Sequence, residues 1–132
     1  MKYRILLLLG LAVTYVAPIF AHHSFAAEFD SSKSITLTGM VTKFDLINPH
    51  GWIYLEGKDE NGKEGKWSVE TGNVSTLLRR GWTKESLKPG TEVIIQGSRA
   101  KDGSNTINAR EVKLPDGRKL FAGSSEGDAT PK

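Results

Sequence analysis

Apolar residues alternate with polar ones along much of the chain, and this pattern predicts β-strands. From Ser34 onward, Ile35 and Leu37 follow one phase of the alternation, and the apolar phase changes beyond Gly39 on the way to Leu46. A phase change at a glycine within a long strand predicts a bulge or a strongly coiled strand. We therefore expect one long first strand over this segment.

Turn signals divide the following chain into further strands. The four predicted strands cover residues 52–55, 66–71, 93–95 and 106–114. Asn-Gly at 61–62 is the strongest short hairpin signal and joins the second strand to the third. Asp-Gly at 102–103 turns the fourth strand toward the fifth, and Asp-Gly at 116–117 predicts a last small hairpin ending at Leu120 and Phe121.

Residues 73–80 differ in kind, because their apolar positions recur at helical spacing. These positions are Val74, Leu77 and Leu78. Asn73 or Ser75 can cap the start of a short helix. Arg79-Arg80 suits the negative end of the helix dipole, and this structural role is a simpler interpretation than an anion site beside Trp82.

The order of elements predicts an all-β fold: a small five-stranded OB-like barrel with one short helix between strands 3 and 4. Closing the sheet also removes exposed strand edges. An open five-stranded meander with a packed helix is the alternative. The helix should close one end of the barrel, over a core that comprises Leu37, Val41, Ile53, Leu55, Val69, Val93, Ile95, Ile107 and Val112.

The buried face of the second strand depends on the length of the loop that follows it. A two-residue turn would set Tyr54 opposite Val69, whereas a three-residue loop would group Ile53 and Leu55 with Val69. A slip of one residue exchanges the two faces of a strand. The pattern therefore leaves open whether Trp52 and Tyr54 face the core or the surface.

The first 21 residues have the layout of a secretory signal peptide. Lys2 and Arg4 precede an apolar run over residues 5–16, and Ala21 provides a small residue at the exit. The apolar run is shorter than the roughly 20 residues that a bilayer-spanning helix needs. An uncleaved N-terminal anchor is the alternative to a cleaved signal.

Cleavage after the signal peptide divides the chain into three parts. We expect a signal peptide over 1–21, an OB-like β-barrel domain over 22–123, and a flexible Ser/Gly/Asp tail over 124–132. The mature protein should be periplasmic or secreted, with no stable membrane span after signal cleavage.

Composition narrows the classes of function. The 132-residue chain has no cysteine, which excludes a disulfide scaffold, a cysteine-based zinc site, an iron–sulfur cluster and a cysteine nucleophile. The signal peptide removes two of the 18 basic residues and none of the 15 acidic ones, so the net charge falls from +3 to +1. A nearly neutral exported chain argues against a nucleic-acid partner.

Six motifs together resemble a family of small secreted bacterial proteins, the domain-of-unknown-function family 6152. They are His-His-Ser-Phe at 22–25, Asn-Pro-His-Gly-Trp at 48–52, Leu-Arg-Arg-Gly-Trp-Thr at 78–83, Leu-Lys-Pro-Gly at 87–90, Ala-Lys-Asp-Gly-Ser at 100–104 and Leu-Pro-Asp-Gly-Arg-Lys-Leu-Phe at 114–121. The resemblance covers essentially the whole mature domain. It implies a secreted protein and no particular activity.

Histidines are the only concentrated chemical signal, and two of the three lie at the predicted mature N-terminus. If cleavage follows Ala21, His22 supplies a free amine and an imidazole, and His50 can add a third nitrogen donor. If cleavage falls one bond earlier, His23 becomes the third residue, and the amine, two amides and its imidazole form a site for Cu(II) or Ni(II). Planar nitrogen donors suit Cu(II), so His22, His23 and His50 are candidate copper ligands.

The same histidines are also compatible with roles that involve no copper. The pair near the cleavage site can simply be solvated, and His50 beside Pro49 can cap a turn. Three histidines also resemble a catalytic zinc set, but a fourth ligand is not evident. Residues 22–33 are a short mixed segment that we expect to form an arm laid on the domain. Glu28 or Asp30 in this arm can add a carboxylate, although carboxylates so close to solvent are usually just solvated.

The sequence contains no recognisable catalytic motif. It has no nucleophile elbow, phosphate loop, dinucleotide fingerprint or metalloprotease helix. We therefore favour a non-enzymatic binding or accessory protein of the cell envelope, whose ligand and oligomeric state the sequence leaves unknown. An enzyme with an unrecognised active site is the alternative.

Overall fold

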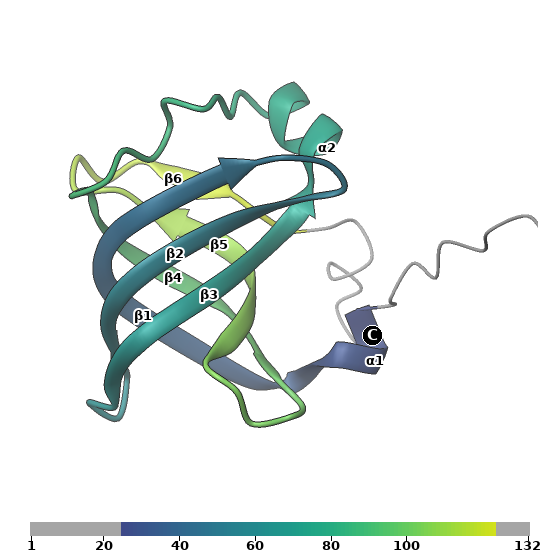
Figure 1. Ribbon diagram of the computed structural model, residues 1–132, viewed down its shortest axis with the longest axis vertical. Helices are drawn as coiled ribbons and strands as arrows, with labels where there is room; N and C mark the ends of the chain where they lie inside the picture. Colours follow the sequence, from purple (N-terminus) through teal and green to yellow (C-terminus); the bar gives the residue numbers. More distant parts are fainter. Residues whose placement is uncertain (1–24, 124–132) are drawn as a thin grey trace, which may run out of the picture.

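β-Strands make up most of the fold, as the alternating pattern predicts. The structure is a computed structural model and describes residues 25–123 (Figure 1). Its elements are α1 (Phe25–Glu28), β1 (Phe29–Leu46), β2 (His50–Asp59), β3 (Glu64–Asn73), α2 (Val74–Arg79), β4 (Glu92–Ala100), β5 (Thr106–Lys113) and β6 (Lys119–Phe121).

Five of the strands form a closed ring. Strands follow the order β3-β2-β1-β4-β5-β6, and a parallel pairing of residues 68–70 in β3 with residues 106–108 in β5 closes the ring. The other pairings are antiparallel. The all-β prediction is therefore confirmed, and the single helix between β3 and β4 is present. Closure rules out the open meander.

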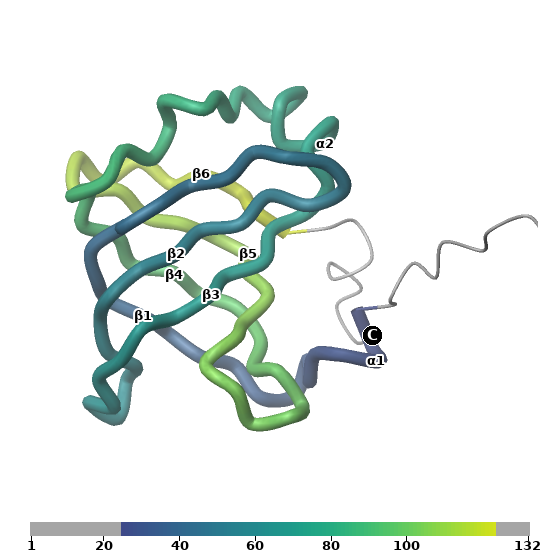
Figure 2. The backbone as a smooth tube through the Cα atoms, viewed as in Figure 1, coloured from purple at the N-terminus to yellow at the C-terminus, as the bar shows by residue number. Residues whose placement is uncertain are grey.

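β1 is the long coiled strand that the sequence predicts. It pairs with β4 along its first part and with β2 along its second part, so it bends around one side of the ring (Figure 2). The pairing with β2 shifts register between Val41 and Lys43. Nearby, Gly39 faces Gly57, and a Cβ on Gly39 would lie only 2.4 Å from the Glu56 carbonyl oxygen. Glycine therefore permits the close approach of the two strands at the bend.

The interior of the ring holds the predicted core. None of the predicted strand residues is more than 1% exposed; they are Leu37, Val41, Ile53, Leu55, Val69, Val93, Ile95, Ile107 and Val112. Val74 and Leu77 of α2 are also buried, but Leu78 is 53% exposed, so the expectation that it helps to close the end of the barrel is wrong. A helix of six residues presents only one narrow face to the ring, and Leu77 occupies it.

The register of β2 and β3 settles which face is buried. Ile53 lies opposite Val69, and the backbone N–H of Asp59 donates to the Lys63 carbonyl at 3.1 Å, so three residues, 60–62, span the turn. The longer of the two loops considered from sequence is correct. Trp52 and Tyr54 accordingly lie on the outer face, where both are half-buried.

Two elements extend the predicted arrangement. A short sixth strand, β6, pairs with β5 outside the five-stranded ring and forms the last small hairpin that the sequence predicts around Asp116-Gly117. The expected arm before residue 34 is instead a short helix, α1, followed by strand, because Phe29 and Asp30 pair with the end of β4. The predicted signal peptide (1–21) and tail (124–132) lie outside the described residues. Between residues 25 and 123, no helix is long and apolar enough to cross a membrane.

Candidate functional site

A histidine and a glutamate from neighbouring strands form the most distinctive polar pair of the outer surface. His50 begins β2, and its Nδ1 contacts Oε1 of Glu70 in β3. The His50 side chain is 33% exposed, whereas the Glu70 side chain is only 10% exposed. The pair therefore combines an accessible imidazole with an almost buried carboxylate.

A register shift in the β2–β3 ladder places the two side chains together. His50 is opposite Asn73 and Trp52 is opposite Glu70, so β3 carries one residue more than β2 between these pairs. Such a bulge re-aims neighbouring side chains. It brings His50 and Glu70 to one face, although they are 20 residues apart in sequence.

The backbone beneath the pair is held by tight packing. The hydroxyl of Thr71, which is fully buried, donates to the Gly51 carbonyl at 3.0 Å. A Cβ on Gly51 would lie 2.6 Å from this hydroxyl oxygen and 3.2 Å from Cδ1 of Leu77. The residue after His50 therefore has to be small, and the start of β2 has little freedom to move.

Helix α2 supports the same end of the ring (Figure 1). Its first N–H group, on Val74, donates to the Pro49 carbonyl at 3.2 Å. The Asn73 side chain caps the helix by accepting the Thr76 N–H at 2.8 Å, so Asn73 rather than Ser75 is the N-cap. The turn that precedes His50 is thus anchored to the helix.

A groove of about 560 Å³ adjoins the histidine–glutamate pair. Trp52 and Glu70 form one wall, residues 27–29 of α1 and the following strand form another, and the β4–β5 loop completes the lining. Lys101 ties this loop to the N-terminal segment, since its Nζ donates to the Ala26 carbonyl at 2.5 Å and its N–H donates to the Glu28 carbonyl at 2.8 Å. The described chain therefore begins beside the groove.

The structure places one of the three predicted metal ligands. His50 lies at this site, whereas His22 and His23 lie outside the described residues. Across residues 25–123, no group of three or more histidine or carboxylate side chains is placed to hold a metal ion. His50 and Glu70 therefore form a pair and not a complete ligand set.

Sequence reasoning missed Glu70. Its position in β3 carries no local signal, because the residue is simply one more polar position in a strand. The register produced by a three-residue loop does place it opposite Trp52, close to His50. The pairing register of β2 and β3 was therefore the only feature of the sequence that could have pointed to Glu70.

Arg79 and Arg80 have structural partners, which agrees with the structural role that the sequence favours over an anion site. The Arg80 guanidinium lies 4.1 Å from the centre of the Phe121 ring and donates to the Gly123 carbonyl at 2.9 Å. Arg79 donates to the Thr76 hydroxyl at 3.1 Å. Arg80 therefore holds the end of α2 against β6 and Gly123, whereas Arg79 bonds within the helix.

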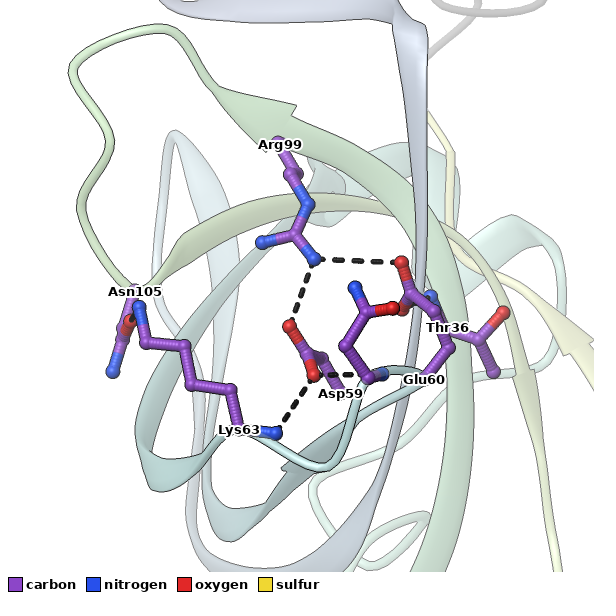
Figure 3. A network of polar contacts seen from close by, with 7 residues as sticks. Thr36, Asp59, Glu60, Lys63, Arg99 and Asn105 are labelled. Carbon is purple, nitrogen blue, oxygen red and sulfur yellow. Dashed lines mark hydrogen bonds and ion pairs between the residues drawn. The ribbon is translucent and has the colours of Figure 1, made fainter.

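A second polar cluster lies at the opposite end of β2 (Figure 3). Arg99 of β4 donates to an Asp59 carboxylate oxygen at 2.9 Å and lies 3.4 Å from Glu60. The other Asp59 oxygen accepts the N–H groups of Asn61 and Lys63, both at 2.9 Å. The Arg99 guanidinium and these N–H groups hold the pKa of Asp59 below its ordinary value. These contacts fasten the β2–β3 turn to β4, so we assign the cluster a structural role.

Comparison with known proteins supports the resemblance seen in the sequence. The chain matches the family of unknown function DUF6152 over residues 11–109. It belongs to this family. The match spans all three histidines and Glu70. No curated protein and no solved structure matches the chain significantly.

Within this DUF6152 member, the motif Asn-Pro-His-Gly-Trp at 48–52 has a clear structural meaning. Pro49 accepts the bond from α2, Gly51 fits against Thr71, and Trp52 lines the groove. These neighbours hold His50 at the outer end of β2. The motif thus presents an imidazole from a rigid backbone.

Proposed function

We propose that this protein is a non-enzymatic copper-binding or accessory module of the cell envelope, exported by residues 1–21. In this proposal, Cu(II) is held by the mature N-terminus, with His22, His23 and His50 as the candidate ligands. The observation that carries the proposal is that one groove is lined both by Glu70, which contacts His50, and by residues 27–29 near the start of the described residues.

The start of the described residues supports this arrangement. His22 and His23 precede Phe25 in sequence by three and two residues. Phe25 is held against β1, because its ring stacks on Phe29 at a centroid distance of 5.7 Å. Glu70, the partner of His50, lines the groove together with Phe29. The groove thus adjoins both the partner of His50 and the segment that follows His22 and His23 in sequence.

Donor chemistry supports copper, because nitrogen donors bind Cu(II) more tightly than they bind Ni(II) or the other divalent first-row metals. Cleavage after Ala21 makes the His22 amine and imidazole a chelate, and His50 completes a set of three nitrogen donors. Cleavage one bond earlier makes His23 the third residue of an amine, amide and imidazole site. Both sets favour the tetragonal nitrogen coordination of Cu(II).

A comparison of two N-termini tests the proposal. Protein that begins at His22 is titrated with Cu(II) against a competing chelator and examined by electron paramagnetic resonance, beside the same protein with its N-terminal amine acetylated. We expect acetylation to weaken binding at least tenfold, because it removes the amine donor on which both candidate sites depend. Equal binding by the two proteins, or Kd values no tighter than about millimolar for both, would overturn the proposal.

Export and the role of His50 are tested separately. N-terminal sequencing of the protein from its host should find a chain that begins near residue 22. His50→Ala should weaken copper binding if the turn supplies the third ligand, and the nitrogen hyperfine pattern should change. Recovery of the chain with Met1 intact from the cytoplasm would refute the export part of the proposal.

A further inference from the structure

We propose that the groove beside β2 and β3 binds a neutral saccharide. In this inference, Trp52 is the stacking surface, and Glu70 and Asn108 form hydrogen bonds with the hydroxyl groups of the sugar. The ligand is not a metal, so the inference goes beyond the proposed function and does not depend on it. All residues that carry it lie within the part of the chain that the structure describes.

The three side chains lie in one line across neighbouring strands. Trp52 of β2 is opposite Glu70 of β3, and Glu70 is opposite Asn108 of β5. Successive residues of a strand point to opposite faces of the sheet. The sequence neighbours Ile53 and Ile107 are fully buried in the core. Trp52, Glu70 and Asn108 therefore share the outer face of the ring.

Asn108 is a buried polar residue that the fold itself does not use. It is only 6% exposed, and its side chain makes no hydrogen bond to another residue between positions 25 and 123. Buried polar side chains are normally hydrogen-bonded. The amide of Asn108, which can donate and accept, therefore keeps its hydrogen-bonding capacity for a ligand or for water.

The groove of about 560 Å³ gives a ligand access to this line of residues. Trp52 and Glu70 line it, and so does Thr106, which precedes Asn108 by two residues and points to the same face. Sites for small molecules typically measure about 300–1,000 Å³. The groove is therefore large enough for a ligand that contacts Trp52 and Glu70 and reaches toward Asn108.

The types of donor and acceptor favour hydroxyl groups. A carboxylate such as Glu70 only accepts hydrogen bonds, whereas the amide of Asn108 donates and accepts. A sugar hydroxyl also does both, so neighbouring hydroxyls can serve the two side chains together. Ser104 and Thr106 add hydroxyl-bearing side chains to the lining. The indole of Trp52 offers an apolar face to the C–H groups of a sugar ring.

The charges around the groove disfavour other classes of ligand. An anion would meet the three carboxylates of the lining, and the one cation of the lining, Lys101, donates to the Ala26 carbonyl at 2.5 Å. A cation would compete with His50, which already contacts Glu70. An apolar ligand would cover the Asn108 amide without giving it a partner. A neutral, hydroxyl-rich ligand avoids all three conflicts.

Titration with neutral oligosaccharides tests the proposal. The probes are cellohexaose, maltohexaose and an N-acetylglucosamine hexamer. They are added, in the presence of a metal chelator, to protein that begins at His22 and so contains every described residue. We expect calorimetry to detect binding of at least one probe with a Kd tighter than about 1 mM. If none of the three binds, the proposal is overturned, whatever the outcome of the copper titration.

The tryptophans report where a probe binds. Trp67 and Trp82 are buried, whereas Trp52 is half-buried and lines the groove. In proton–nitrogen correlation spectra, bound saccharide should shift the indole N–H signal of Trp52, assigned with Trp52→Phe, more than the other two. Trp52→Ala should weaken binding at least about tenfold through loss of the stacking surface. Binding that leaves the Trp52 signal and the Trp52→Ala affinity unchanged would place the ligand elsewhere and refute the proposal.

Tyr54→Ala is the matched control for the aromatic residue. Tyr54 is a half-buried aromatic residue on the same outer face but is not part of the groove lining. Its replacement should leave saccharide affinity as in the wild type. An equal loss of affinity in Tyr54→Ala and Trp52→Ala would contradict the assignment of the groove.

Asn108→Ala separates a binding role from a structural one. We expect it to weaken saccharide binding about tenfold, as loss of a ligand hydrogen bond does. Stability in urea should not fall, because the amide has no partner within the described fold. A fall in stability with unchanged affinity would make Asn108 a structural residue and overturn its part in the proposal.

Discussion

The two buried tryptophans allow a stringent test of the packing of the ring. Trp82 is 1% exposed and Trp67 is 2% exposed, so Trp→Phe removes the same atoms from similarly buried sites. The indole N–H of Trp82 donates to the Phe121 carbonyl at 3.0 Å. Among the described residues, the buried N–H of Trp67 has no hydrogen-bond partner. The substitutions therefore differ mainly in the polar group that they remove.

The difference can be given a magnitude. Trp82→Phe loses a hydrogen bond worth about 1 kcal/mol net, and it leaves the Phe121 carbonyl without this donor. Trp67→Phe removes a buried donor whose desolvation costs about 1–3 kcal/mol. The loss of buried apolar area is common to both substitutions and cancels to first order. We expect Trp82→Phe to lose about 2–4 kcal/mol more free energy of unfolding than Trp67→Phe.

Urea unfolding followed by far-UV circular dichroism measures this difference, because the signal does not depend on tryptophan fluorescence. Trp52→Phe is the control, since Trp52 is half-buried on the outer face and its replacement should cost less than Trp82→Phe. If Trp67→Phe lowers the free energy of unfolding as much as Trp82→Phe does, the hydrogen bond of Trp82 to Phe121 does not contribute the expected difference in stability, and the prediction is refuted.

Three further predictions test other parts of the fold. Gly51→Ala should destabilise the protein by about 1–3 kcal/mol in urea unfolding, because the new Cβ would meet the Thr71 hydroxyl at 2.6 Å; unchanged stability would contradict the close packing under the candidate site. Asn73→Ala should cost about 1 kcal/mol through loss of the helix cap, and Ser75→Ala should cost less, since Asn73 accepts the Thr76 N–H; equal losses would refute the assignment of the cap. The folded state lowers the pKa of Asp59, so its contribution to stability is complete above the ordinary carboxyl pKa and is lost as the pH falls through the lower folded value. Acid unfolding of Asp59→Asn should therefore depend less steeply on pH than that of the wild type, and parallel profiles would count against the role of this carboxylate.

Local pattern alone predicted much of the fold. Alternation identified the strand positions of core residues such as Leu37 and Ile95, because the pleat sends every second side chain to the same face. Helical spacing identified α2, because Val74 and Leu77 are three residues apart and so lie on the same side of this short helix. The histidine in the motif at 48–52 was also visible as a candidate, because its chemistry does not depend on the fold.

Longer-range contacts decided the rest. The choice between two registers of β2 and β3 depended on the turn, where Asp59 accepts two N–H groups and stabilises the longer loop. The exposure of Leu78 depended on which side of α2 the ring covers. Hydrophobic alternation settles neither question. The same alternating sequence can pair in two registers that differ by one residue, and it does not show which side of a helix is covered.

The partner of His50 was decided by tertiary structure. Glu70 is 20 residues away in sequence and reaches the imidazole only because β3 bulges beside the start of β2. That bulge accompanies the buried hydroxyl of Thr71 bonded to Gly51, a contact between strands. The sequence determined that an imidazole stands at the start of β2. The packing of the closed ring determined which carboxylate contacts it, because that contact depends on register across strands and not on local pattern.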